Sequence, residues 1–137
     1  MLNSAPVVLV VDDECFARLF AVQILLDAGF DVLDACNAAE AVRILRENPD
    51  VGILITDIGM PGELDGWGLV AEARRAQPEL RIVVMSGMAD PGKGVRPGID
   101  SFVAKPFTAG AFFGALTGLA PIAAGRRVPD MAMPLRA

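Results

Sequence analysis

Charged residues of the kinds that bind metal ions and phosphate groups follow three short apolar runs of this sequence. They are Asp12 and Asp13 after the run VVLVV, Asp57 after the run VGILIT, and Lys105 after the run SFVA. If the runs are parallel strands, all four charges lie at one edge of the sheet, because the carboxyl ends of parallel strands meet there. That edge is where open α/β sheets bind ligands. The spacing therefore predicts a ligand site.

Three carboxylates at one edge would need a cation between them. Two carboxylates about 4 Å apart repel by about 4 kcal/mol at an effective dielectric constant near 20. Mg²⁺ suits such a cluster, because it binds one or two carboxylates and shares its other positions with water and phosphate. Acidic residues after strands also cap helices, and this role explains one acid among Asp12, Asp13 and Glu14. It does not explain Asp57, which follows a different strand.

Composition excludes several classes of function. The absence of histidine removes imidazole bases, Ser-His nucleophiles and the commonest zinc ligand. A net charge of -5 argues against nucleic-acid binding, since phosphate contacts need clustered lysine and arginine. Cys15 and Cys36 lack metal or redox spacing, and we expect both to be small buried residues in a reducing compartment. No stretch approaches the roughly 20 apolar residues of a membrane span, so we expect a soluble, cytoplasmic protein.

The chain alternates between apolar runs and helical stretches, as βα units do. Runs of about five apolar residues suit strands that are buried on both faces of a parallel sheet. The clearest are VVLVV and VGILIT, and the weaker ones are DVLDA, RIVVMS and SFVA. Helices are predicted over Cys15 to Ala28, Ala38 to Glu47, Gly66 to Gln77 and Thr108 to Leu119. Asn37 and Glu40 form a capping box at the second helix, and Gly29 stands where the first helix should end.

Two segments depart from this alternation. The residues between Ser86 and Ser101 include two prolines and four glycines, which cost about 3 and about 1 kcal/mol each inside a helix. We therefore expect the fourth helix to be short, irregular or absent. Residues 121–137 contain three prolines and no periodic pattern. The sequence thus predicts one domain over residues 1–120 and a flexible tail over 121–137, with docking of the tail on a partner as the alternative.

A set of short motifs follows in order along the chain. They are Asp12-Asp13-Glu14, Asp57-Ile58-Gly59-Met60-Pro61, Asp65-Gly66, Ser86-Gly87, Phe102 and Lys105-Pro106-Phe107. In this order they resemble the receiver domain of two-component response regulators, over about residues 7 to 119. The resemblance implies an α/β, doubly wound, flavodoxin-like fold with five parallel strands in the order 2-1-3-4-5. The family usually has seven residues from the acceptor aspartate to the Asp-Gly pair, whereas Asp65 lies eight residues beyond Asp57.

The resemblance also implies roles for the charged residues. Asp57 would be the phosphoacceptor, attacking a phosphoryl group on a histidine of a partner kinase. Asp13, Asp57 and the backbone carbonyl of Gly59 would bind Mg²⁺ directly, and Asp12 would act mainly through water. Lys105 would neutralise charge on the phosphoryl oxygens, which is most of what phosphoryl transfer asks of a protein. The partner would supply the histidine that this chain lacks.

Two further residues would form a switch in this family. Ser86 would donate its hydroxyl to a phosphoryl oxygen, and Phe102 would be an aromatic ring that moves when Ser86 moves. Without the resemblance, Ser86 would be an ordinary residue at a strand end and Phe102 an ordinary core aromatic.

The first predicted helix has two apolar stripes. One comprises Ala17, Phe20, Ala21, Ile24 and Ala28, and the other comprises Cys15, Leu19, Val22 and Leu26. One stripe can face the sheet. The second is either covered by neighbouring segments or free to dock on a histidine kinase or histidine phosphotransfer protein, as the resemblance implies for this helix.

Together these features predict a stand-alone response regulator that is not an enzyme. It would accept a phosphoryl group at Asp57 and signal by contact with an unknown downstream protein, binding neither nucleic acid nor a membrane. A phosphate sink or phosphorelay intermediate, and a degenerate interaction module that is never phosphorylated, are alternatives. A Mg²⁺-dependent phosphatase of similar topology would need an acid two residues beyond Asp57, and that position is Gly59.

Overall fold

The computed structural model describes residues 6–59, 65–87 and 99–117. Five parallel strands form one sheet in the order β2-β1-β3-β4-β5. They are β1 (Val7–Val11), β2 (Asp31–Ala35), β3 (Val51–Asp57), β4 (Arg81–Ser86) and β5 (Ser101–Ala104). The five apolar runs therefore form the expected strands, and the expected flavodoxin-like order is confirmed. The third strand extends one residue further than expected and includes Asp57.

Four helices connect or follow the strands in the described part of the chain. They are α1 (Cys15–Asp27), α2 (Ala38–Glu47), α3 (Gly66–Ala76) and α4 (Ala109–Thr117). Each lies where a helix is predicted, and the ends of α1 and α3 differ from the prediction by one residue. The expectation of an irregular fourth crossover falls mostly on residues 88–98, and the expected tail falls on residues 121–137. Both segments lie outside the described residues.

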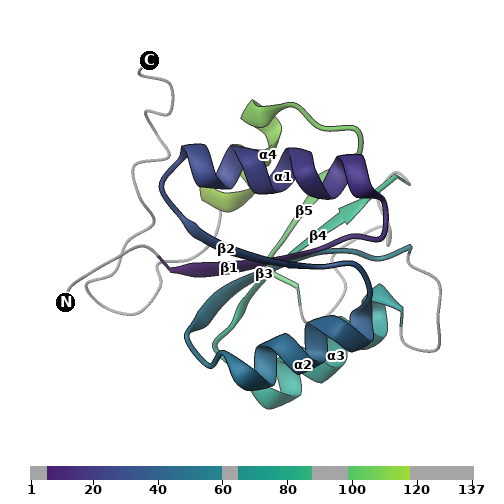
Figure 1. Ribbon diagram of the computed structural model, residues 1–137. Helices are drawn as coiled ribbons and strands as arrows, with labels where there is room; N and C mark the ends of the chain where they lie inside the picture. Colours follow the sequence, from purple (N-terminus) through teal and green to yellow (C-terminus); the bar gives the residue numbers. More distant parts are fainter. Residues whose placement is uncertain (1–5, 60–64, 88–98, 118–137) are drawn as a thin grey trace.

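The sheet is covered on both faces (Figure 1). Helices α1 and α4 lie on one face and α2 and α3 on the other. Alternate strand residues point to the two faces, so Val8, Val10 and Met85 join the core under α1 and α4. Leu9 and Ile82 join the core under α2 and α3. Burial on both faces explains why β1 and β3 read as continuous apolar runs, whereas the edge strand β2 exposes Asp31 and Asp34.

Helix ends follow local chemistry. The Asn37 side chain accepts a hydrogen bond from the Glu40 backbone N–H at 2.7 Å. The Glu40 carboxylate accepts from the Cys36 N–H at 2.9 Å, one residue earlier than in a standard capping box. This bond to the backbone holds the pKa of Glu40 below its usual value. Gly29 follows Ala28, the C-cap residue of α1, and has a φ of 97°, a conformation in which glycine is favoured.

Arg74 ties the end of α3 to two strands. Its guanidinium donates to the carbonyls of Pro78 and Leu80, both at 2.7 Å, and to the Asp100 carboxylate at 3.0 Å. Asp100 also accepts from the Ile82 N–H at 2.8 Å. The start of β4 and the residue before β5 are thus held by one charge-assisted network.

The expectation that both cysteines are buried is wrong. Cys15 and Cys36 are exposed free cysteines rather than buried ones. Both lie at element ends, where a small side chain is not drawn into the core. Val22, a member of the second apolar stripe of α1, is partly buried against the core. Among the described residues, no helix is long and apolar enough to cross a membrane.

Candidate functional site

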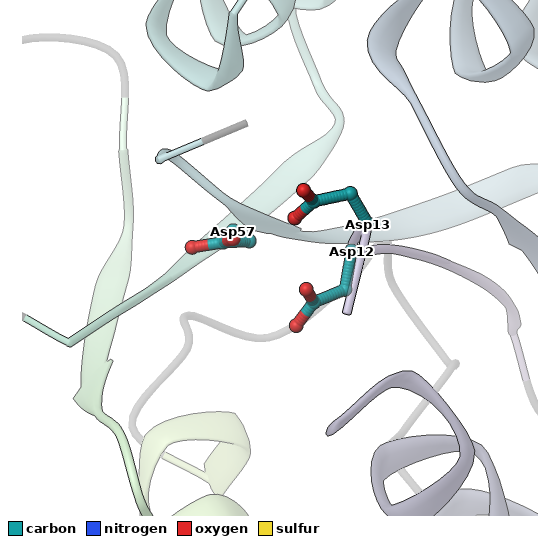
Figure 2. A group of neighbouring side chains, drawn as sticks. All are labelled: Asp12, Asp13 and Asp57. Atoms are coloured by element: carbon teal, nitrogen blue, oxygen red, sulfur yellow. The ribbon is translucent and has the colours of Figure 1, made fainter. Parts of the chain in front are cut away.

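Three aspartates meet at the carboxyl edge of the sheet (Figure 2). Asp12 and Asp13 follow β1, and Asp57 ends the neighbouring strand β3. Each offers a carboxylate oxygen, and these oxygens lie within 4.8 Å of one another. Asp12 is 0% exposed and Asp57 is 7% exposed, whereas Asp13 is exposed. The predicted acidic cluster is therefore present, with one member open to solvent.

Backbone hydrogen bonds fix the strand ends that carry this cluster. The Asp12 N–H donates to the carbonyl of Ala35 on β2 at 3.2 Å, and the Lys105 N–H donates to the carbonyl of Ser86 at 2.7 Å. In both places the sheet ladder continues one residue beyond the strand. The charged residues are thus held by sheet backbone rather than by free loops.

Lys105 reaches into the cluster from the end of β5. Its Nζ lies 2.9 Å from Asp12 Oδ2 and 3.7 Å from Asp57 Oδ2. The other oxygen of Asp12 accepts from the Glu14 N–H at 2.9 Å. Glu14 in turn caps α1 by accepting from the Ala17 N–H at 3.0 Å. Both oxygens of Asp12 are therefore engaged by the protein, which leaves Asp13 and Asp57 as the more available carboxylates.

The surroundings shift two pKa values at the site. Burial raises the pKa of Asp57, and the negative charges of Asp12 and Asp13 add to this, against lowering by the Gly59 N–H and by Lys105. Burial alone would lower the pKa of Lys105. Its hydrogen bond to Asp12, with the charges of the surrounding acids, outweighs burial and raises that pKa instead. A protonated lysine therefore lies beside Asp57, whose ionisation is made costly by burial and by the neighbouring negative charges.

The residues after Asp57 are held close to it. The Gly59 N–H donates to Asp57 Oδ1 at 3.3 Å. Asp65 caps α3 by accepting from the Gly68 N–H at 2.8 Å. Gly66, the first residue of α3, lies so close to Ile58 and Asp57 that an added Cβ would overlap the Ile58 Cα and the Asp57 carbonyl oxygen. Glycine is thus required at position 66 by direct packing on the end of β3 and the residue that follows it.

The two predicted switch residues lie on adjacent strands. Ser86 ends β4 and is buried. Phe102 is on β5, opposite Val84, and packs partly buried against the core under α2 and α3. The register pairs Ser86 with Ala104 rather than with Phe102. The structure thus brings Ser86 to the carboxyl edge and places Phe102 two residues further back.

Arg18 is a site residue that the sequence reasoning missed. Its Nη1 donates to the Asp12 carbonyl at 2.9 Å, and its Nε donates to Asp34 Oδ2 on β2 at 2.9 Å. Arg18 thereby links α1, the loop that carries Asp12 and the end of β2. An arginine at this position of an amphipathic helix is typical of a solvated surface, so the sequence carried no local signal for this contact.

A cavity of about 620 Å³ opens beside the cluster. Its polar lining, among the described residues, comprises Glu14, Asp57, Gly59, Gly87 and Lys105. The other side is apolar and consists of Phe16, Ala17, Phe20, Pro106 and Phe107. Phe16 and Phe20 are exposed large apolar residues of α1, together with Leu19 and Leu26. Phe16 belongs to neither predicted stripe, so this aromatic wall was not anticipated.

The donor set fits Mg²⁺. Hard oxygen ligands converge, one carboxylate is exposed and can take a cation without further burial, and Gly59 is exposed beside Asp57. In the described part of the chain no cysteine belongs to the cluster, which argues against a soft metal.

Residues 8–117 match the family model of the response regulator receiver domain, so the chain belongs to that family. Chemotaxis protein CheY of Thermotoga maritima is 35% identical over 105 residues, covering 73% of this chain and 85% of that protein. Sensor kinase CckA of Brucella abortus is 32% identical over 111 residues, covering 78% of this chain and 12% of the kinase. The family consists of signalling domains of two-component response regulators, and its members typically bind Mg²⁺ at an acidic pocket.

Solved structures of the family have the same fold. A response regulator receiver protein from Pseudomonas putida superposes with a TM-score of 0.74 at 30% identity, covering 85% of this chain and 98% of that one. One from Sinorhizobium medicae superposes with a TM-score of 0.71 at 32% identity, covering 82% and 92%. The chain spans less than half the length of several curated relatives, such as 44% of the probable transcriptional regulator ycf27 of Porphyra purpurea.

Proposed function

We propose that Asp57 accepts a phosphoryl group from a histidine kinase or a histidine phosphotransfer protein in a Mg²⁺-dependent reaction, and that the phosphorylated chain signals by protein contact. One observation carries the proposal. Asp57 ends its strand in an open cavity, beside two further carboxylates and with the Lys105 ammonium 3.7 Å from its Oδ2. A nucleophile, anionic ligands for a cation and a fixed positive charge are the parts that phosphoryl transfer requires.

In the proposed reaction, an Asp57 carboxylate oxygen attacks phosphorus and forms a P–O bond. The P–N bond to the donor breaks, and its electron pair remains on the leaving nitrogen. Lys105 offsets charge on the phosphoryl oxygens, with Asp12 holding its ammonium in place. Asp13, Asp57 and the Gly59 carbonyl are the proposed direct ligands of Mg²⁺, and Asp12 is proposed to act through water because both of its oxygens are already engaged. When bound, Mg²⁺ neutralises charge shared between the carboxylates and the phosphoryl group.

We extend the proposal to the switch. The buried Ser86 at the end of β4 would donate its hydroxyl to a phosphoryl oxygen. Phe102 would change its packing against the core under α2 and α3 in response. Support comes from position alone, since Ser86 lies at the same edge of the sheet as Asp57 and on the neighbouring strand.

The partner surface is proposed to be the exposed side of α1. Cys15, Leu19 and Leu26 from the second apolar stripe of α1 are exposed, and Phe16 is exposed beside them. Val22 is removed from this surface because it packs against the core. Leu19→Asp should slow phosphotransfer from a partner protein and leave phosphorylation by a small donor unchanged. Equal loss with both donors would contradict docking at this surface.

Intact mass after incubation with Mg²⁺ and phosphoramidate or acetyl phosphate tests the main proposal. The chain should gain one phosphate, and Asp57→Ala should abolish the gain. Asp50→Ala is the matched control, because Asp50 is an exposed aspartate immediately before the start of the same strand. No gain in the unaltered chain with either donor would contradict the proposal and favour a degenerate interaction module.

A further inference from the structure

The cavity beside Asp57 has two chemically different sides. Its volume of about 620 Å³ lies within the range of pockets that bind small organic molecules, roughly 300–1,000 Å³. The polar side carries the groups assigned to the phosphoryl group in the proposed function. The apolar side presents Phe16, Phe20 and Phe107, and none of these has a role in phosphoryl transfer itself. The cavity therefore has space and a second surface for another part of the donor.

The geometry of phosphoryl transfer says which part of the donor lies there. The attacking and leaving atoms lie roughly in line on opposite sides of phosphorus. Because Asp57 attacks from the closed, sheet side of the cavity, the leaving group must lie toward the open side. Of the lining residues, α1 contributes two exposed aromatic side chains, Phe16 at 80% and Phe20 at 47% exposure.

The aromatic wall is braced from behind. Phe107 stacks on Phe20 with ring centroids 5.6 Å apart, and on Phe112 of α4 with centroids 4.9 Å apart. Phe112 is buried, so it fixes the far end of this stack. Phe16 lies one turn before Phe20 on α1, which places it on the same side of the helix. It is 80% exposed, and a phenylalanine face left open beside an acceptor site is available to a second flat ring.

We propose that Phe16, supported by Phe20 and Phe107, forms a subsite for the ring of a phosphorylated imidazole. Phe16 is then a specificity-determining residue for the phosphoryl donor. This inference rests on the proposed function. A flat aromatic leaving group can stack on Phe16 in an offset or edge-to-face arrangement. Ammonia from phosphoramidate or acetate from acetyl phosphate has no such face. Phe16 thus favours donors that release imidazole over donors that release a small polar group.

The proposed step is balanced with imidazole as the leaving group. Asp57 forms a P–O bond as the P–N bond to the ring breaks, and the electron pair of the P–N bond stays on that nitrogen. In the donor, the other ring nitrogen already carries a proton, so the leaving group departs from phosphorus as neutral imidazole. Phosphoramidate, with its nitrogen protonated, breaks the same kind of bond and releases ammonia. The two donors therefore differ chiefly in the presence of the ring.

The test compares phosphorylation rates with phosphoimidazole and with phosphoramidate, both with Mg²⁺ and both read by intact mass. Phe16→Ala should slow the reaction with phosphoimidazole by about three- to tenfold and change the rate with phosphoramidate by less than about twofold. Phe16→Leu keeps an apolar side chain without a flat face. Its rate with phosphoimidazole should fall between the rates of the unaltered chain and of Phe16→Ala. Gln23→Ala, an exposed position of the same helix outside the cavity lining, is the control and should change neither rate.

Three results would overturn the subsite. Equal slowing with both donors would mean that Phe16 shapes the acceptor site in general. Unchanged rates with both donors would mean that no ring stacks there, and Phe16 would then be a protein docking contact if only transfer from a partner protein became slower. Failure of the unaltered chain to react with either donor would contradict the proposed function, and the subsite with it. Circular dichroism of Phe16→Ala checks that the variant is folded. Removal of a side chain that is 80% exposed should not disturb the fold.

Discussion

Replacing Lys105 by methionine should destabilise the fold through the carboxylates that it faces. The ammonium lies 2.9 Å from one oxygen of Asp12 and 3.7 Å from one oxygen of Asp57. At an effective dielectric constant near 20, each pair is worth roughly 4 to 6 kcal/mol of Coulomb attraction. Desolvation of the buried charges offsets much of this, and the loss of one partner from a buried pair typically costs about 3 to 5 kcal/mol. Because Lys105 is 18% exposed, we expect Lys105→Met to lower the free energy of unfolding by about 2 to 4 kcal/mol.

Urea unfolding in EDTA at pH 7, followed by circular dichroism, measures this loss. Arg43→Met is the matched control. Arg43 lies 3.3 Å from Glu47 and 3.8 Å from Glu40, but it is 57% exposed. Exposed pairs contribute at most about 1 kcal/mol. If Lys105→Met loses no more stability than Arg43→Met, then burial does not strengthen the ion pairs of Lys105 with Asp12 and Asp57, and the prediction is refuted.

The same variant should respond to Mg²⁺ and pH in a defined direction. Mg²⁺ can replace part of the missing positive charge, so it should stabilise Lys105→Met more than the unaltered chain. The raised pKa of Asp57 means that its ionisation opposes folding. This destabilisation is absent below its ordinary pKa of 3.8, grows as pH rises from there toward the raised folded-state pKa, and is complete above that pKa. Lys105, whose pKa is also raised, keeps its stabilising charge until pH rises above 10.5. The difference between variant and unaltered chain should therefore shrink as pH falls toward 4.

Three further substitutions test single contacts. Arg18→Ala should weaken Mg²⁺ binding several-fold, measured by calorimetric titration, because Arg18 holds the Asp12 carbonyl; Arg43→Ala should leave the affinity unchanged. Asp100→Ala should lower the free energy of unfolding by about 1 to 3 kcal/mol, since it removes one of the acceptors of the Arg74 guanidinium and the acceptor of the Ile82 N–H; an effect below about 0.5 kcal/mol would contradict this network. Asn37→Ala should cost about 1 kcal/mol in urea unfolding by removing the α2 cap, and Asn37→Asp should retain most of the stability.

The strands and the acidic cluster were predictable because they depend on local sequence and one geometric rule. A parallel strand buried on both faces is apolar almost throughout, so β1 and β3 were clear without an alignment, whereas the edge strand β2, with two exposed aspartates, gave a weaker signal. Parallel strands end at one edge, so Asp12, Asp13, Asp57 and Lys105 had to lie near one another. The cap at Asn37 was predictable for the same reason, since its partner lies three residues away.

Contacts between elements were harder to predict. The hydrogen bond from Arg18 to Asp34 depends on how far α1 overhangs β2, and periodicity along one helix does not contain that distance. Leu25 is buried in α1 although neither predicted stripe includes it, and Phe16 is open beside the acceptor site. A helix with two apolar sides gives no sequence signal for which side the sheet will cover. The prediction that both cysteines are buried was wrong for a related reason. The average burial of a residue type says little about a particular residue at the start of a helix or after a strand.

Gly66 has a consequence for how the acceptor site tolerates change in sequence. Its Cα packs on the Asp57–Ile58 peptide with no room for a side chain, so α3 begins in direct contact with the acceptor strand. The segment between Asp57 and Asp65 is one residue longer than is usual in the family, yet both of its ends are fixed by this contact and by the Asp65 cap. Insertions in that segment can therefore accumulate without displacing the acceptor carboxylate, whereas any substitution of Gly66 would push α3 away from the strand. The length of this segment can therefore vary, whereas the residue at position 66 must remain glycine.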